Sequence, residues 1–197
     1  MSIRVEPLTG ARLQAHLGDV ARLRIEVFRD YPYLYDGDLE YERRYLSAFA
    51  ASENAVIVVA FDGATVVGAS TAAPLEGQME EISAPFRRRG DDLSSIFYFG
   101  ESVLQRGFRG HGIGVRFFEE REAQALRCGA AATAFCAVVR PKDHPRRPPG
   151  YEPLDAFWMK RGYRPEAGLI CKMSWKEIGE AEESPKPMQF WMKRLRS

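Results

Sequence analysis

The most constraining feature of this sequence is an apolar strand followed by a glycine-rich turn and a helix, over residues 96 to 127. The strand is predicted from Ile96 to Leu104, which is rich in aromatic and β-branched residues. Gly110, Gly112 and Gly114 alternate in the turn, so the backbone can come close to a ligand there. The first N–H groups of a helix have no partner within it, and together with the helix dipole they attract anions. This stretch therefore predicts a phosphate site.

Two common phosphate-binding loops are excluded by the residues at the end of the turn. A P-loop requires Gly-Lys-Ser/Thr, whereas this chain has Gly114-Val115-Arg116. A dinucleotide-binding fingerprint requires a third glycine where Val115 stands. It also requires an acidic residue for the ribose, but the next predicted strand ends at Arg140. A nucleotide-binding domain of either kind is therefore not favoured.

The pattern that is present is Arg-x-x-Gly-x-Gly, formed by Arg109, Gly112 and Gly114. It resembles the acetyl-CoA pyrophosphate loop of the GNAT superfamily of N-acetyltransferases. A second segment, Phe-Trp-Met-Lys-Arg-Gly-Tyr at residues 157–163, is similar to a Phe-Tyr-x-Lys-x-Gly-Phe pattern of that family. The two motifs stand in the family's order, and the resemblance covers residues 55 to 175.

The resemblance implies an α/β fold, with one domain over residues 1–197 and a mixed, splayed sheet of about seven strands with helices on both faces. It implies that acetyl-CoA is the co-substrate and binds where two parallel strands part. The main chain near Val103 and Leu104 would pair with the pantetheine, and the amides of the turn would hold the pyrophosphate. The implied cofactor contacts are Val103, Leu104, Arg109, Gly110, His111, Gly112, Ile113, Gly114 and Trp158.

Apolar patterns place the other elements. A strand, a helix and a strand around the glycine turn imply a parallel pair joined by a right-handed crossover. Asp62-Gly63 predicts a hairpin turn. Residues 75–92 show no clear pattern, and residues 140–153, with five prolines, exclude a regular helix. Further strands are predicted at 3–6 (closed by Pro7), 55–61, 65–71, 131–139, 169–175 and 188–195, and helices at 20–28, 39–51 and 155–161.

Acyl transfer to an amine requires a group that removes a proton, and Glu101 is the predicted base. Strict alternation along the strand puts Tyr98, Gly100 and Ser102 on one face and Glu101 on the other. A bulge at Gly100 would turn Glu101 toward a different face. The alternative is that Glu101 only forms a hydrogen bond to a neighbouring turn.

A proton donor for the leaving thiolate is less obvious. The resemblance places the family's acidic tyrosine at Trp158, whose indole has no usable proton. Tyr151 is the predicted acid because it precedes the short helix. Tyr163 follows Gly162 and is expected to pack under the sheet.

The acceptor is predicted to be an amine that carries a positive charge before reaction. The segment from Tyr31 to Tyr41 combines tyrosines with carboxylates, and both attract an ammonium group. The alternative for this segment is a capped and packed loop between two helices. The predicted acceptor-binding residues are Tyr33, Tyr35, Asp36 and Asp38, and the acceptor is a small-molecule or peptide amine of unknown identity.

Composition bounds the remaining possibilities. A net charge of +1 gives no reason to expect nucleic acid as a partner. The chain has neither a signal-peptide pattern nor an apolar run of membrane-spanning length, so a cytoplasmic enzyme without a membrane partner is expected. Three cysteines without metal spacing predict reduced thiols and no metal site. A homodimer is left open, and the rival function is a non-catalytic acyl-CoA-binding or regulatory domain.

Overall fold

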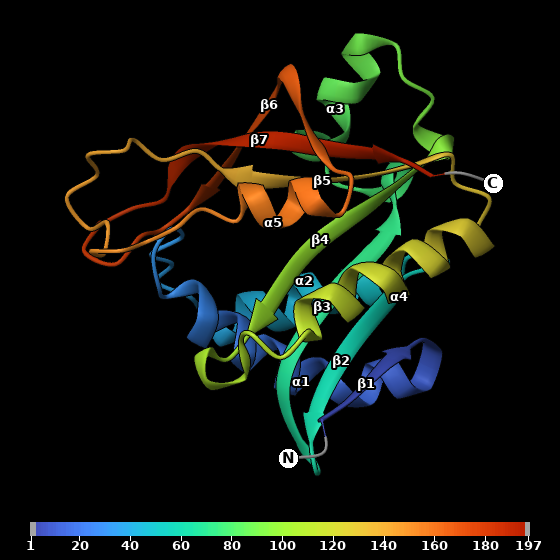
Figure 1. Ribbon diagram of the computed structural model, residues 1–197, viewed down its shortest axis with the longest axis horizontal. Coiled ribbons are helices and arrows are strands. Elements are labelled where there is room, and N and C mark those ends of the chain that lie inside the picture. The colour runs from blue at the N-terminus through green and yellow to red at the C-terminus, as the bar shows by residue number, and fades with distance from the viewer. Residues whose placement is uncertain (1–2, 196–197) are drawn as a thin grey trace.

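A computed structural model describes residues 3–195 and contains one seven-stranded sheet, in the order β1-β2-β3-β4-β5-β7-β6 (Figure 1). Only β4 and β5 are parallel neighbours, and the other pairs are antiparallel. This confirms the predicted mixed sheet and its parallel pair. The strands are β1 (Ile3–Leu8), β2 (Val56–Asp62), β3 (Thr65–Pro74), β4 (Ile96–Leu104), β5 (Ala132–Val138), β6 (Arg164–Trp175) and β7 (Ser184–Arg194).

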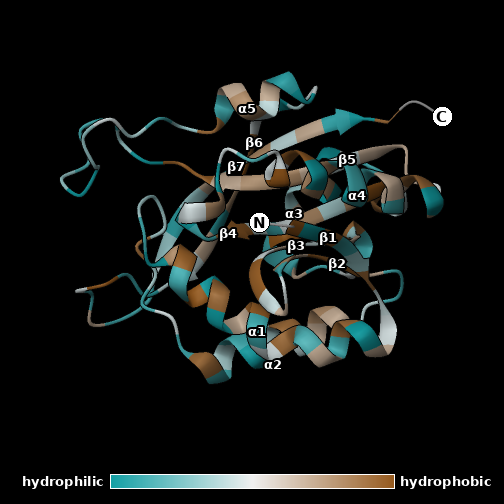
Figure 2. Ribbon diagram, turned by 60° about the horizontal axis from the view of Figure 1, so that its bottom comes forward, coloured by the Kyte–Doolittle hydropathy of each residue, from teal (hydrophilic) through white to brown (hydrophobic). Residues whose placement is uncertain are grey.

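Helices cover both faces of the sheet (Figure 2). Successive residues of β2 point to opposite faces, so Val58 joins the core under α4 and Val59 joins the core under α1 and α2. Both residues are completely buried, which explains why β2 is apolar throughout. The helices are α1 (Gly10–Phe28), α2 (Leu39–Ala50), α3 (Glu80–Arg89), α4 (Ile113–Arg127) and α5 (Asp155–Lys160).

Tertiary context overrode two local predictions and gave structure to a segment that had no clear pattern. The first strand does not close at Pro7 but continues to Leu8, since β1 is an edge strand that needs no donor on its outer side. Residues 80–89 form α3 although Pro85 lies inside it, because Ile82 and Phe86 are buried in the core. The last two strands begin earlier than predicted, and the register of β6 with β7 shifts between Pro165 and Ile170.

Within residues 3–195, no helix combines the length and the apolar character that crossing a bilayer requires.

Candidate functional site

The sheet opens between its two parallel strands. β4 and β5 pair only through Ile96 with Ala132, Phe97 with Thr133, and Tyr98 with Ala134. Beyond this point β4 runs away from β5, as Figure 1 shows, and continues beside β3 alone. The edge of β4 that faces β5 therefore has no strand partner from residue 99 to residue 104, within the part of the chain that the structure describes. Such an edge offers main-chain groups to an extended ligand.

The glycine turn lies at the end of this open edge. Gly110 and Gly112 have φ angles of 83° and 78°, in the left-handed region that favours glycine. Gly112 is the N-cap of α4, and no side chain caps the helix there. The main-chain N–H groups of Ile113 and Gly114 therefore lack partners within the helix, beside the end of β4, in an arrangement that suits an anion.

Gly114 is required for a different reason. A Cβ atom at this position would lie 3.3 Å from Cζ of Phe157, so the ring from α5 packs directly against the start of α4. Arg109, on the other side of the turn, donates from Nε to the Leu104 carbonyl at 3.2 Å and ties the turn to the strand end. His111 is exposed.

β4 contains a bulge at Gly100, one of the two alternatives that the sequence left open for Glu101. The pairing register of β3 and β4 shifts between Ser70 and Ala72. Gly100 and Glu101 therefore lie together opposite the single residue Thr71. Oγ1 of Thr71 accepts a hydrogen bond from the main-chain N–H of Glu101, at 3.2 Å. The bulge reverses the direction of the side chains that follow it.

Because of this reversal, Glu101 points to the face covered by α1 and α2, away from Phe99, which packs under α4. Oε2 of Glu101 lies 2.5 Å from Nη1 of Arg24, and the Nε of Arg24 also pairs with Glu42. All three charged residues are buried. One oxygen of each carboxylate, Oε1 of Glu42 and Oε1 of Glu101, is buried without a hydrogen-bond partner. We call Arg24, Glu42 and Glu101 the ion cluster.

Aromatic rings enclose the ion cluster. The guanidinium carbon of Arg24 lies 4.6 Å from the ring centroid of Tyr45 and 5.2 Å from that of Phe28. Burial alone would lower the pKa of Arg24, but Glu101, Tyr45 and Glu42 raise it above its usual value. Arg24 therefore stays charged. The pKa of Tyr45 is raised, first by burial and then by the charge of Glu101, so its phenol stays neutral.

A second buried arginine holds the bulge from the opposite face. Nη1 of Arg121, in α4, donates to the carbonyls of Glu101 at 3.2 Å and Thr71 at 3.4 Å, while Nε donates to Phe117. Its guanidinium lies 4.3 Å from the ring centroid of Phe99. Burial lowers the pKa of Arg121 to about 10, which leaves it charged at neutral pH. These contacts satisfy the carbonyls at the bulge.

The predicted acceptor segment divides into two parts. Tyr33 and Tyr35 are partly buried, and burial raises the pKa of both phenols. The charge of Glu42 raises the pKa of Tyr35 further. Asp36 lies 3.1 Å from Nζ of Lys176, and Asp38 caps α2 by accepting a hydrogen bond from the Tyr41 amide at 2.8 Å. The two aspartates thus have structural partners in the loop.

The tyrosines considered as acids occupy different environments. Tyr163 is buried, and its hydroxyl lies 2.8 Å from Oγ1 of Thr133 and donates to Glu122 at 3.0 Å, which confirms that it packs under the sheet. Tyr151 is half-buried, with its ring edge-on to Tyr31 at 4.7 Å. Burial first, and then Tyr31, raises the pKa of Tyr151, so its phenol is protonated at neutral pH.

Trp158 packs its ring edge against Phe135 at 5.1 Å and Trp191 at 5.0 Å. It is only partly buried. These contacts fix α5 against β5 and β7.

Sequence reasoning missed Arg24, Glu42, Arg121 and Phe157. A signal for the first two was present, because each interrupts the apolar stripe of its helix. Arg24 stands four residues from Val20 and from Phe28, and Glu42 stands four residues before Leu46. Opposite charges on the buried faces of consecutive helices indicate a buried ion pair.

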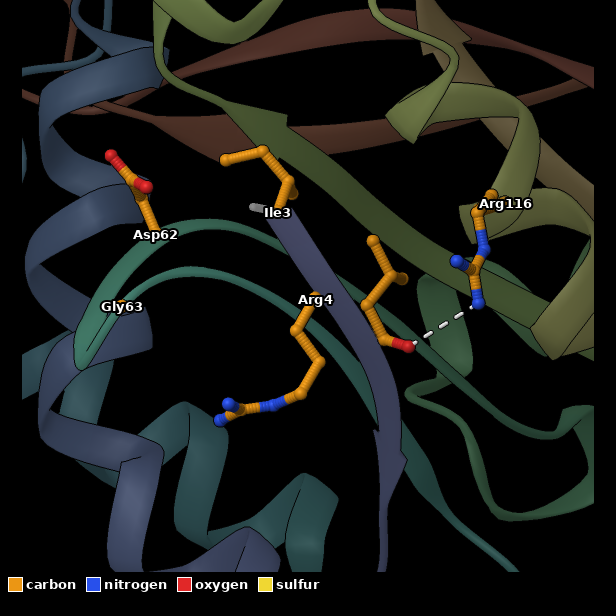
Figure 3. Close-up of a pocket in the computed structure, with 6 residues that line it drawn as sticks. Ile3, Arg4, Asp62, Gly63 and Arg116 are labelled. Carbon is orange, nitrogen blue, oxygen red and sulfur yellow. Dashed lines mark hydrogen bonds between the residues drawn. The ribbon is translucent and has the colours of Figure 1, made fainter. Parts of the chain in front are cut away.

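Two surface pockets lie near these elements. One, of about 650 Å³, is at the outer edge of the sheet beside β1 and holds no residue of the bulge or the ion cluster (Figure 3). In it, Nη2 of Arg116 donates to the Val5 carbonyl at 3.4 Å. The other, of about 440 Å³, lies between α2 and residues 77–79, and we call it the α2 pocket. It is lined by Tyr41, Arg44, Tyr45, Ala48, Phe49, Ser52, Gly77, Gln78 and Met79.

Solved structures share this architecture, although no protein-family model and no curated protein sequence matches the chain. A ribosomal-protein-alanine N-acetyltransferase from Brucella melitensis superposes with a TM-score of 0.62 at 14% identity, over 98% of this chain and 99% of that one. The Salmonella typhimurium protein yncA, solved with its cofactor acetyl-CoA, gives 0.62 at 10% identity, over 100% and 96%. An acetyltransferase of the GNAT family from Streptococcus pneumoniae gives 0.59 at 12% identity, over 99% and 100%. Identities this low establish a common fold only.

Proposed function

We propose, because the chain has the fold of the GNAT N-acetyltransferases, that it transfers an acetyl group from acetyl-CoA to an amine. One observation carries the proposal: the open edge of β4 leads directly to the uncapped start of α4. An acyl-CoA has an extended amide-containing arm and a pyrophosphate, and these two features match an unpaired strand edge and a helix N-terminus. The fold neighbour yncA, solved with acetyl-CoA, adds support.

The residues of this chain fit the two parts of the co-substrate. In the proposal, the main chain of Val103 and Leu104 binds the pantetheine arm, since it lies on the open edge. The amides from Gly112 to Gly114 bind the pyrophosphate. Arg109 and Gly110 shape the turn, and exposed His111 and partly buried Trp158 border the bound molecule. The co-substrate supplies an acyl group activated as a thioester.

Glu101 is proposed to remove a proton from the acceptor amine. An amine attacks only as the neutral base, so an ammonium group must first lose a proton. Oε2 of Glu101 is engaged by Arg24, and the unpartnered Oε1 is the atom that takes this proton, directly or through water. The bulge matters here because it turns the side chain of Glu101 to the face covered by α1 and α2, where Arg24 holds its Oε2.

The amine nitrogen forms a bond to the acyl carbon, and the bond from that carbon to sulfur breaks. Tyr151 is proposed to give its phenolic proton to the leaving thiolate. The nitrogen loses its second proton, which passes through water to the Tyr151 phenolate. Positioning of the two reactants by the strand edge supplies several kcal/mol, and each proton transfer about 10²-fold or more.

The acceptor is proposed to be a primary amine, of small-molecule or peptide type. Tyr33 packs against Phe28, whose ring also contacts Arg24 of the ion cluster. After burial, the charge of Glu42 raises the pKa of Tyr35. Both tyrosines keep their proposed role in binding the amine. Asp36 and Asp38 would act through their charge alone, because a lysine and a helix end already engage them.

A non-catalytic acyl-CoA-binding domain is the second candidate, and the buried ion pair of Glu101 with Arg24 favours it. One experiment separates the two. The protein is titrated calorimetrically with acetyl-CoA, and free thiol is then followed with a panel of amines, amino acids and peptides. Binding with amine-dependent thiol release supports the enzyme, and binding without release by any amine supports the binding domain. Absence of binding contradicts both.

A further inference from the structure

The ion cluster carries one more negative than positive charge. Glu42 and Glu101 share the single guanidinium of Arg24, and the exposed fractions of the three residues are 0%, 8% and 9%. Removing an uncompensated charge from water is costly, so buried carboxylates in proteins have partners for their oxygens. Here Oε1 of Glu42 and Oε1 of Glu101 have none. The cluster thus lacks one positive charge and its donors.

The α2 pocket and the ion cluster both contact Tyr45. Tyr45 lines the pocket, and the face of the same ring covers Arg24. The hydroxyl of Tyr45 lies 3.7 Å from the position that a Cβ atom of Gly100 would take, so the ring reaches from the pocket to the bulge. The Tyr45 side chain therefore separates a surface pocket from the carboxylate of Glu101.

The charges around the pocket favour a cation. Burial first, and then the carboxylate of Glu42, raise the pKa of Tyr41, which lines the pocket. Arg24 lowers this pKa, and the more weakly acting Glu183 and Glu81 raise it. Arg44 also lines it, but its Nη1 lies 3.2 Å from Oε1 of Glu40. The rest of the lining is mainly aromatic and aliphatic. A ligand with an apolar body and a cationic end matches both properties.

We infer that the α2 pocket admits an amine with an apolar or aromatic body, and that its ammonium group binds to the unpartnered oxygens of Glu42 and Glu101. The inference rests on the proposed function, for which it names the class of acceptor. The ammonium supplies the missing charge and up to three donors. Glu42 is then a binding residue, and Arg24 holds both carboxylates in place.

The test uses phenethylamine and the uncharged 2-phenylethanol, which have the same shape. Calorimetric titration of the wild-type protein should show the amine binding at least about tenfold more tightly than the alcohol. Glu101→Gln keeps one oxygen for Arg24 and removes the excess charge, so it should lower the amine's affinity at least about tenfold and leave the alcohol unchanged. Glu119→Gln, a matched loss of an exposed acid on α4, should change neither.

Thermal unfolding gives a second readout. If the cluster is a binding site for a cation, Glu101→Gln should leave Tm unchanged or raise it, because Arg24 and Glu42 then form a neutral pair. A clear fall in Tm would mark the cluster as a purely structural network and overturn the inference. Equal binding of amine and alcohol, or no binding of either, would overturn it as well. Glu42→Gln serves in the same tests if Glu101→Gln does not fold.

Acetyl-CoA titration of the same proteins separates the two proposals. Selective amine binding by a protein that does not bind acetyl-CoA would overturn the proposed function and leave the cation site standing. Acetyl-CoA binding without amine selectivity would overturn the cation site and leave the proposed function standing.

Discussion

Oγ1 of Thr71 fills the space beside Gly100 in which any other residue would carry its Cβ atom. The hydroxyl can lie there because residue 100 has no side chain, and from that place it accepts the hydrogen bond of the Glu101 amide. This relationship fixes the bulge, and the bulge decides which face of the sheet receives the carboxylate of Glu101.

Gly100→Ala should therefore lower the free energy of unfolding by about 2–3 kcal/mol, because the new Cβ displaces Thr71 or the strand. Thr71→Ala should cost about 1 kcal/mol for its lost hydrogen bond. The double variant should cost clearly less than the sum, since the alanine at position 71 leaves room for the new Cβ. Urea denaturation measures all three. Gly107→Ala, where a Cβ meets nothing within 4 Å, is the control, and strict additivity would contradict this account.

Arg121 should be needed for both stability and activity. Arg121→Met leaves the carbonyls of Thr71 and Glu101 without their donor and should destabilise the protein by about 2–4 kcal/mol. The disturbed bulge should also lower kcat/KM for thiol release about tenfold or more. Arg116→Met, on the exposed side of the same helix, should change unfolding by less than about 0.5 kcal/mol. Similar losses for both variants would exclude a specific role for Arg121.

Gly112→Val should abolish acetyl-CoA binding while the protein remains folded. At a φ of 78° a β-branched residue is strained, and relief of that strain would turn the amides away from the anion site. The protein should stay folded because a Cβ there meets nothing within 4 Å. Gly129→Val, with a φ of 74° at the other end of α4, imposes the same strain away from the site. Equal acetyl-CoA affinities for the two variants, measured by calorimetry, would defeat the assignment.

Tyr151→Phe should lower kcat about ten- to a hundredfold and leave acetyl-CoA affinity unchanged, since it removes only a proton donor. The matched control is Tyr163→Phe, which loses hydrogen bonds to Thr133 and Glu122. That variant should lose about 1–2 kcal/mol of stability and keep its kcat. A parental kcat for Tyr151→Phe would show that solvent protonates the thiolate.

Stability should fall as the pH rises above about 10. The pKa values of Tyr33, Tyr45, Tyr98 and Tyr163 are raised, chiefly by burial, so the folded protein keeps protons that the unfolded chain loses. Each such phenol contributes a loss of up to about 1.4 kcal/mol per pH unit. Arg121, with a pKa lowered to about 10, acts in the opposite direction but is a single group.

Urea midpoints between about pH 9 and pH 11, with tyrosinate absorbance as a second signal, measure this effect. The slope should be shallower for Tyr163→Phe. Tyrosinate that forms before unfolding would show that the phenols are not protected by the fold.

The sequence alone determined the elements whose signals are local. The apolar runs of β2, β4 and β5, the hairpin at Asp62-Gly63 and the glycine turn before α4 were all predictable, because period, chain length and turn chemistry are properties of neighbouring residues. The order of these elements and two short motifs also predicted the fold. The glycine inside the apolar strand indicated where a bulge could form, but the sequence left open whether it does.

The tertiary structure decided what these elements bring together. Arg24 and Glu42 are separated in sequence from Glu101, and only the packing of α1 and α2 on β4 makes them one buried cluster. The same holds for α3. Pro85 and the charged residues of this segment give no helical pattern, yet the helix forms because it buries Ile82 and Phe86. Asp38 shows the converse: its carboxylate, read as a ligand for an amine, caps the start of α2. Local patterns specify backbone geometry, whereas the partner of a charged side chain depends on contacts between distant segments, which no local pattern contains.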